Sequence, residues 1–167
     1  FYGYTAHRDA HYHYPHLGNR PLYDGFVDVT DRLAKSYSTD LITARSKKWI
    51  VDHKKEHPEQ PFFIYLCYTA PHAGMRIPTT SHLTQNSNYP KGGGLTGGVQ
   101  WNEDATDGQI NTATGTIDQG MHPEVTHAVG DDGKPWPDQA KRHATMVRRI
   151  DDAMADLVHL LKDLEVD

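Results

Sequence analysis

The sequence predicts an α/β fold, because two helical patterns lie on either side of one continuous apolar run. The run spans residues 61–70, PFFIYLCYTA, and amphipathic helices are expected over residues 39–55 and 136–167. An apolar run without polar alternation is typical of a central strand in a parallel sheet that is covered on both faces. A helix, a short proline-containing turn and a buried strand form half of a βαβ unit. We therefore expect central parallel strands with flanking helices.

Composition narrows the class of protein. The chain has 167 residues, of which 37% are hydrophobic and 23% charged, and its formal net charge is −5. This length is sufficient to bury a core, and the acidic balance argues against a nucleic-acid-binding surface. The longest apolar run is far shorter than the roughly 20 residues that span a bilayer, so no membrane span is expected. The single cysteine, Cys67, excludes an intrachain disulfide framework.

Residues 1–38 form an aromatic and histidine-rich region. Its first 26 residues show neither a period of 2 nor one of 3.6, and we interpret them as an ordered loop. Five side chains of metal-binding type lie close together in it: His7, Asp9, His11, His13 and His16. No second cluster of matching spacing completes a four-ligand zinc site, so we predict no metal site from this chain.

Residues 39–78 contain the first helix, the apolar run and a turn with a histidine. Ser38 or Thr39 offers an N-cap oxygen, and the lysines of the helix, Lys47 among them, are expected to stay in water. Cys67 is expected to be a small buried hydrophobic residue of the strand.

Ala70-Pro71-His72-Ala73 follows the apolar run directly. Ligands of open α/β sheets bind outside the carboxyl ends of the strands, which is where this order places His72. An imidazole there can donate a hydrogen bond to an oxyanion or protonate a leaving group near neutral pH. We predict His72 as the catalytic residue; the alternative is an exposed loop histidine beside a turn proline.

The second half of the chain divides into two parts. Residues 79–135 hold ten of the 14 glycines and are predicted to be a long irregular insertion. Residues 136–167 predict a long amphipathic helix, because apolar residues recur at spacings of 3 or 4 from Met146 to Leu164. The Asp151-Asp152 pair within that helix is interpreted as part of its solvated face.

Three segments, taken in order, resemble the sulfatase family of the alkaline phosphatase superfamily. FYGYTAHRDAHYHYP is similar to the family's FxGY turn with its histidine-rich continuation. YSTDLITARSKKWIVDHKKEHPEQPFFIYLCYTAPHAG resembles its helix, PFFLYL strand and PHxP turn, and AKRHATMVRRIDDAMADLVHLLKDLEVD resembles its MVxRxDDxVG helix. The resemblance covers nearly the whole chain apart from the glycine-rich middle.

The resemblance implies an alkaline-phosphatase-like sandwich that hydrolyses sulfate esters, with a small-molecule or sulfated carbohydrate substrate. His72 matches the PHxP histidine, which contacts the sulfate and assists the leaving group, and Gly74 stands where the family usually has proline. His7 and His11 match a segment that approaches the substrate pocket, so both are expected to bind substrate. A periplasmic or secreted location is also implied.

The cationic side chains expected to meet an anionic substrate include Arg8 and Arg20. The resemblance also implies calcium and a formylglycine made within a C/SxPxR motif, which the sequence from Cys67 to Pro71 does not match. We therefore expect residues 1–167 to be a central fragment of one sulfatase catalytic domain, inactive alone. Two alternatives stay open: a phosphoester or phosphonate hydrolase of the same superfamily, and a non-catalytic histidine-rich module that binds a metal or an anion.

Overall fold

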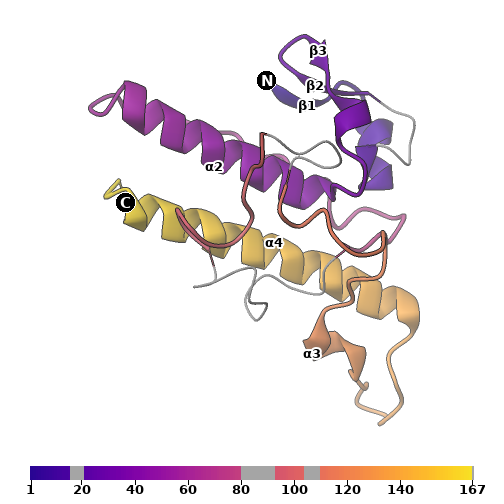
Figure 1. Cartoon of the computed structure of the whole chain (residues 1–167). Coiled ribbons are helices and arrows are strands. Elements are labelled where there is room, and N and C mark those ends of the chain that lie inside the picture. Colours follow the sequence, from indigo (N-terminus) through magenta and orange to yellow (C-terminus); the bar gives the residue numbers. More distant parts are fainter. Residues whose placement is uncertain (16–20, 80–92, 104–109, 167) are drawn as a thin grey trace.

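The computed structural model describes residues 1–15, 21–79, 93–103 and 110–166. Within them the fold is mixed α and β, in agreement with the predicted class, and its sheet is small and antiparallel rather than parallel. The elements in chain order are β1 (Tyr2–Tyr4), η1 (His7–Tyr12, a 3-10 helix), β2 (Leu22–Asp24), β3 (Val27–Asp28), η2 (Thr30–Arg32, also 3-10), α2 (Ser38–Glu56), α3 (Pro123–Thr126) and α4 (Asp138–Asp163) (Figure 1). None of the described helices is long and apolar enough to cross a membrane.

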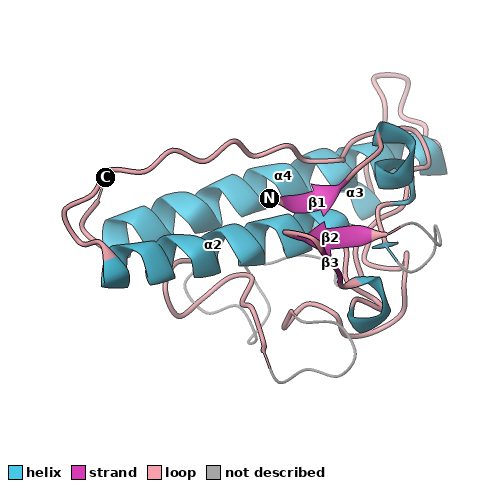
Figure 2. Cartoon of the chain, turned by 90° about the horizontal axis from the view of Figure 1, so that it is seen from above, coloured by secondary structure: helices cyan, strands magenta, loops and turns pink. Residues whose placement is uncertain are grey.

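The two long helices, α2 and α4, pack side by side and form the scaffold of the molecule (Figures 1 and 2). Apolar periodicity predicted both: α2 extends the expected 39–55 by one residue at each end, and α4 lies within the expected 136–167. Asp40 of α2 accepts two hydrogen bonds from Arg149 of α4, and both side chains are buried. Lys47 of α2 contacts Asp156 of α4 in the same way, so the helices run in the same direction.

Three expectations about the polar residues of these helices are wrong. Lys47, expected in water, is buried, and its Nζ donates to Asp156 Oδ1 at 2.6 Å and to the Gly97 carbonyl oxygen at 2.9 Å. Asp152, expected on the solvated face, is also buried. The N-cap of α2 is Tyr37 rather than Ser38 or Thr39, and no side chain caps the helix. Asp40 in the first turn accepts a hydrogen bond from Arg149 of α4. The packing of α2 against α4 determines whether these side chains are buried. That packing cannot be recognised from the sequence of either helix alone.

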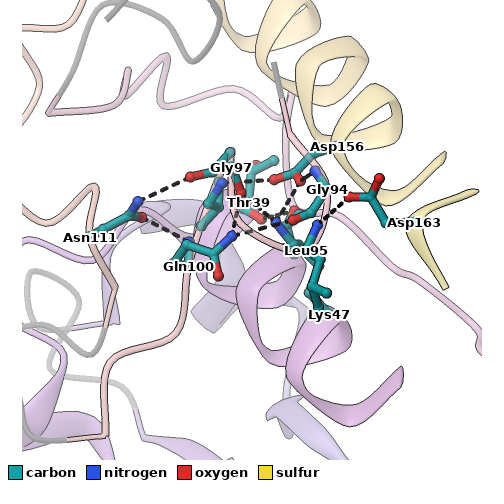
Figure 3. Close-up of polar contacts among 12 residues, drawn as sticks. Thr39, Lys47, Gly94, Leu95, Gly97, Gln100, Asn111, Asp156 and Asp163 are labelled. Carbon is teal, nitrogen blue, oxygen red and sulfur yellow. Dashed lines mark hydrogen bonds and ion pairs between the residues drawn. The ribbon is translucent and has the colours of Figure 1, made fainter. Parts of the chain in front are cut away.

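The described part of the glycine-rich segment wraps around the carboxylate of Asp156 (Figure 3). Backbone N–H groups of Gly94 and Val99 donate to it at 2.8 and 2.7 Å. Gly98 has a φ of +64°, and a Cβ at this position would overlap the carboxylate, so the close approach requires glycine. The predicted irregular insertion is therefore tied to α4 where it is described; residues 80–92 and 104–109 lie outside the described residues.

Residues 61–69 do not form the predicted strand covered on both faces. They are extended and run back along the helix pair without strand pairing to any described residue (Figure 2). Phe62, Ile64 and Leu66 pack against α2 and α4, whereas Phe63 and Tyr65 alternate with them and are 86% and 82% exposed. Cys67 is likewise exposed, contrary to expectation, because it shares the outer face with them. An apolar run alone does not show which of its faces is covered.

The three strands occupy the region that we interpreted as loop. β1 pairs with β2 and β2 with β3, both antiparallel, with Gly3 opposite Tyr23. Strands of two or three residues are too short to produce a period of 2, which is why the pattern missed them. The sheet is joined to α2 by an ion pair between Arg45 and Asp24 at 2.7 Å. Apolar side chains of the sheet, of α2 and of the connecting segments pack together in one core cluster: Leu22, Val29, Leu33, Leu41, Ala44, Val99 and Ile110.

Candidate active site

The turn that carries His72 is held by four hydrogen bonds. The His72 backbone N–H donates to the Thr69 carbonyl oxygen at 3.3 Å, and the His72 carbonyl oxygen accepts from His13 Nε2 at 3.3 Å. The other ring nitrogen of His13 lies 3.1 Å from Thr69 Oγ1. His72 Nδ1 donates to the Ala73 carbonyl oxygen at 2.8 Å, which leaves its Nε2 as the nitrogen available to a ligand. The buried ring of His13 thus positions the backbone of His72.

η1 brings a second histidine to this turn. The rings of His11 and His72 stack with their centroids 3.6 Å apart and an angle of 12° between their planes. Gly74 makes the approach possible: its φ is +127°, and a Cβ there would lie 2.8 Å from the His11 carbonyl oxygen. Proline, with φ fixed near −65°, does not fit this backbone, so the departure from PHxP matches the local geometry.

A groove of about 820 Å³ lies beside this histidine pair, bordered by β1, α2 and the extended residues 61–69. Both His11 and His72 line it. Its lining is largely aromatic and apolar, with Tyr2, Tyr4 and Trp49 among the rings. Arg45 and Asp24 supply an ion pair to the same surface. A largely apolar concavity with a few fixed polar groups is the usual form of a small-molecule site.

The residues singled out in the sequence fall into two groups. His72 and His11 come together, whereas His16 and Arg20 lie outside the described residues, as does the side chain of His7. Sequence reasoning missed His13 as a positioning residue, although it belongs to the same histidine-rich run. Tyr14 was also missed; its buried hydroxyl donates to the Ile77 carbonyl oxygen at 2.7 Å and secures the far side of the turn. Within the described part of the chain, no three His, Cys, Asp or Glu side chains gather into a metal-binding group.

Burial changes the acid–base behaviour of His13. Desolvation of its charged form lowers the pKa of His13 to about 4, from an ordinary value of 6.5. The ring therefore stays neutral in the folded protein at pH values where the unfolded chain is protonated. Neutral His13 can donate from Nε2 to the His72 carbonyl oxygen and accept from the Thr69 hydroxyl.

We predict that this histidine makes the fold sensitive to acid. Between pH 6.5 and about 4 the unfolded state binds the extra proton, so the free energy of unfolding falls as pH falls through that window. The loss by pH 4 is roughly 3 kcal/mol, the energy equivalent of the pKa difference. Urea denaturation at pH 7, 6, 5 and 4 measures it. The non-titrating variant His13→Gln is expected to lose less stability over the same range, and equal losses in both proteins would contradict the assignment.

Comparison with known families identifies the family of this chain. The Sulfatase family model matches residues 1–167, and the chain belongs to the sulfatase family, as the resemblance predicted. Members of this family act on sulfate esters. No curated protein and no solved structure matches the chain.

Sulfatases generally use a formylglycine and a metal ion. The residues described in this chain do not fit either group. Cys67 is followed by Tyr68-Thr69-Ala70-Pro71 rather than by the xPxR that formylglycine formation needs, and no group of three metal-ligating side chains is found among the described residues. The chemistry derived below is therefore limited to what this chain's own side chains do.

Proposed function

We propose that the aromatic groove binds a sulfate ester and that His72 protonates the alcohol oxygen as it departs from sulfur. The observation that carries the proposal is the stacked pair of His11 and His72 at the groove, in a chain of the sulfatase family. His72 Nδ1–H donates to the Ala73 carbonyl oxygen, so a proton at Nε2 is the second proton of the ring, and the imidazolium form is the acid that transfers it to the departing oxygen. His11 orients the imidazole by stacking, and His13 holds the backbone beneath it.

We propose a sulfated carbohydrate as the substrate class. The groove offers both flat aromatic surface and polar groups, which suits a sugar ring with its hydroxyl groups. We also propose the alkaline-phosphatase-like sandwich as the architecture of the complete protein, with calcium and formylglycine as its cofactors. The extended residues 61–69, with apolar side chains on both faces, support that architecture.

We expect the 167-residue chain to bind a sulfate ester without hydrolysing it, because its sequence has no C/SxPxR motif. Binding of phenyl sulfate can be followed by the fluorescence of Trp49, which lines the groove. His72→Ala is expected to weaken binding about tenfold, the loss typical of one hydrogen bond to a charged group. The matched control is His143→Ala, because His143 is exposed on α4 and does not line the groove.

Equal affinities of wild type and His72→Ala would contradict the proposal, and release of phenol by the purified chain would contradict its expected inactivity. Phenyl phosphate serves as the comparison ligand, and a clear preference for it would favour a phosphoester hydrolase. Calorimetric titration with zinc tests the alternative that the chain is a non-catalytic, histidine-rich metal-binding module. A dissociation constant for zinc below about 10 μM would support that alternative.

A further inference from the structure

A second, smaller pocket shares His11 with the aromatic groove. It has a volume of about 470 Å³ and is formed by η1 together with the turn that follows His72. His11 lines both cavities, so the two adjoin at this residue. The lining residues of this cationic pocket are Arg8, His11, Tyr12, Ala73, Gly74 and Arg76.

The chemistry of the cationic pocket differs from that of the protein around it. The chain carries a formal net charge of −5, yet two guanidinium groups and an imidazole line this one cavity. None of the described residues that line it is a carboxylate. A guanidinium group stays charged at all relevant pH values, and its planar fork of donors matches the oxygens of sulfate, phosphate or carboxylate.

Arg76 is held in place by an ion pair with Asp118. Its guanidinium donates to Asp118 at 3.2 Å, and the same carboxylate accepts from Arg142 at 2.7 Å and from the Ile77 backbone N–H at 2.8 Å. The single negative charge of Asp118 is therefore divided between two guanidinium groups, and the positive charge of Arg76 is only partly compensated. Asp118 orients Arg76, which reduces the entropy that this side chain loses when it binds an anion.

The pocket is also fixed relative to His72. Ala73 accepts the hydrogen bond of His72 Nδ1, and Gly74 packs against the backbone of His11, so the wall of the pocket and the catalytic turn are one piece of chain. A ligand group in this pocket therefore has a set position relative to a group bound beside His72. This arrangement can therefore select a ligand by the distance between two anionic groups on the same molecule.

We propose that the cationic pocket, through Arg8 and Arg76, binds a second anionic group of the substrate while the ester to be cleaved lies beside His72. The proposal rests on the function proposed above and narrows its substrate class to sugars that carry at least two anionic groups. A neutral or singly sulfated sugar leaves the pocket without a charged ligand and loses that part of the binding energy.

The test compares a monosulfated and a disulfated disaccharide of the same backbone, titrated into the 167-residue chain at low ionic strength, where exposed charges are least screened. Wild type is expected to prefer the disulfated sugar about tenfold. Arg8→Gln and Arg76→Gln are each expected to reduce that preference about five- to tenfold, because each weakens binding of the disulfated sugar more than binding of the monosulfated one. Arg32→Gln is the matched control, because Arg32 is exposed and lines neither cavity.

The outcomes separate this proposal from the previous one. Equal affinity of wild type for both sugars, or an unchanged preference in both arginine variants, would overturn the cationic pocket. If His72→Ala leaves both affinities unchanged but the arginine variants abolish the preference, the role of His72 fails and the cationic pocket stands. Arg76→Lys is the conservative variant, because it keeps a positive charge near Asp118. Thermal unfolding of each variant shows whether a loss of affinity is caused by misfolding.

Discussion

Asp156→Ala is expected to lower the free energy of unfolding by about 3–5 kcal/mol, because it leaves a buried ammonium group without its partner. Lys47 Nζ lies 2.6 Å from Asp156 Oδ1, and side-chain exposures of 5% and 0% show that water cannot replace the carboxylate. Burial lowers the pKa of Lys47 and raises that of Asp156, since desolvation disfavours both charged forms, while the attraction between the two opposes both shifts. The variant also removes the acceptor of the Gly94 and Val99 backbone N–H groups.

The control for this prediction lies on the same helix and holds the same loop. Asp163 Oδ2 accepts from the Leu95 backbone N–H at 2.8 Å, at the exposed end of α4 (Figure 3). Asp163→Ala should therefore cost about 1 kcal/mol or less, the usual net value of one accessible hydrogen bond. Urea denaturation of both variants at pH 7 measures the difference. Similar losses in the two proteins would show that burial of the Lys47–Asp156 pair does not govern the stability of this region.

The two long helices could be predicted because their evidence is local. Apolar residues recur about two turns apart in α2 and at spacings of 3 or 4 in α4, and these patterns are visible in the sequence of each helix by itself. The burial of Lys47 could not be predicted, because it depends on Asp156, which is 109 residues further along the chain. The outcome for residues 61–69 has a similar cause: their composition fits a covered strand, but strand pairing and burial are decided by segments remote in sequence.

Sequence analysis pointed to two residues of the candidate site but not to its geometry. The position after the apolar run pointed to His72, and resemblance to sulfatases pointed to His11, but neither signal predicted that the rings stack. That contact depends on Gly74, whose positive φ lets the turn approach η1. Arg76 lies only four residues after His72, yet only the folded chain shows that it lines one cavity together with Arg8.

The second large effect is expected at the other buried ion pair, between Asp40 and Arg149. Arg149 donates to both oxygens of Asp40, at 2.6 and 2.5 Å, and the two side chains are 2% exposed or less. Asp40→Leu is expected to cost about 3–5 kcal/mol, because a buried guanidinium cannot lose its proton. Arg149→Met should cost less, since the remaining carboxylate lies in the first turn of α2, where the helix dipole favours negative charge.

A double-mutant cycle tests whether the pair acts as a unit. Asp40→Leu combined with Arg149→Met places two apolar side chains in contact, and replacing a whole buried ion pair in this way is often neutral or stabilising. The double variant should therefore be more stable than Asp40→Leu alone, with a coupling energy of about 2–3 kcal/mol in urea denaturation. The control is Arg148→Met, because Arg148 directly precedes Arg149 on α4, is 41% exposed and pairs with Asp151. This variant should change the free energy of unfolding by less than about 1 kcal/mol. Additive losses in the cycle would mean that Asp40 and Arg149 contribute independently, and that the charge pair does not set the alignment of α2 and α4.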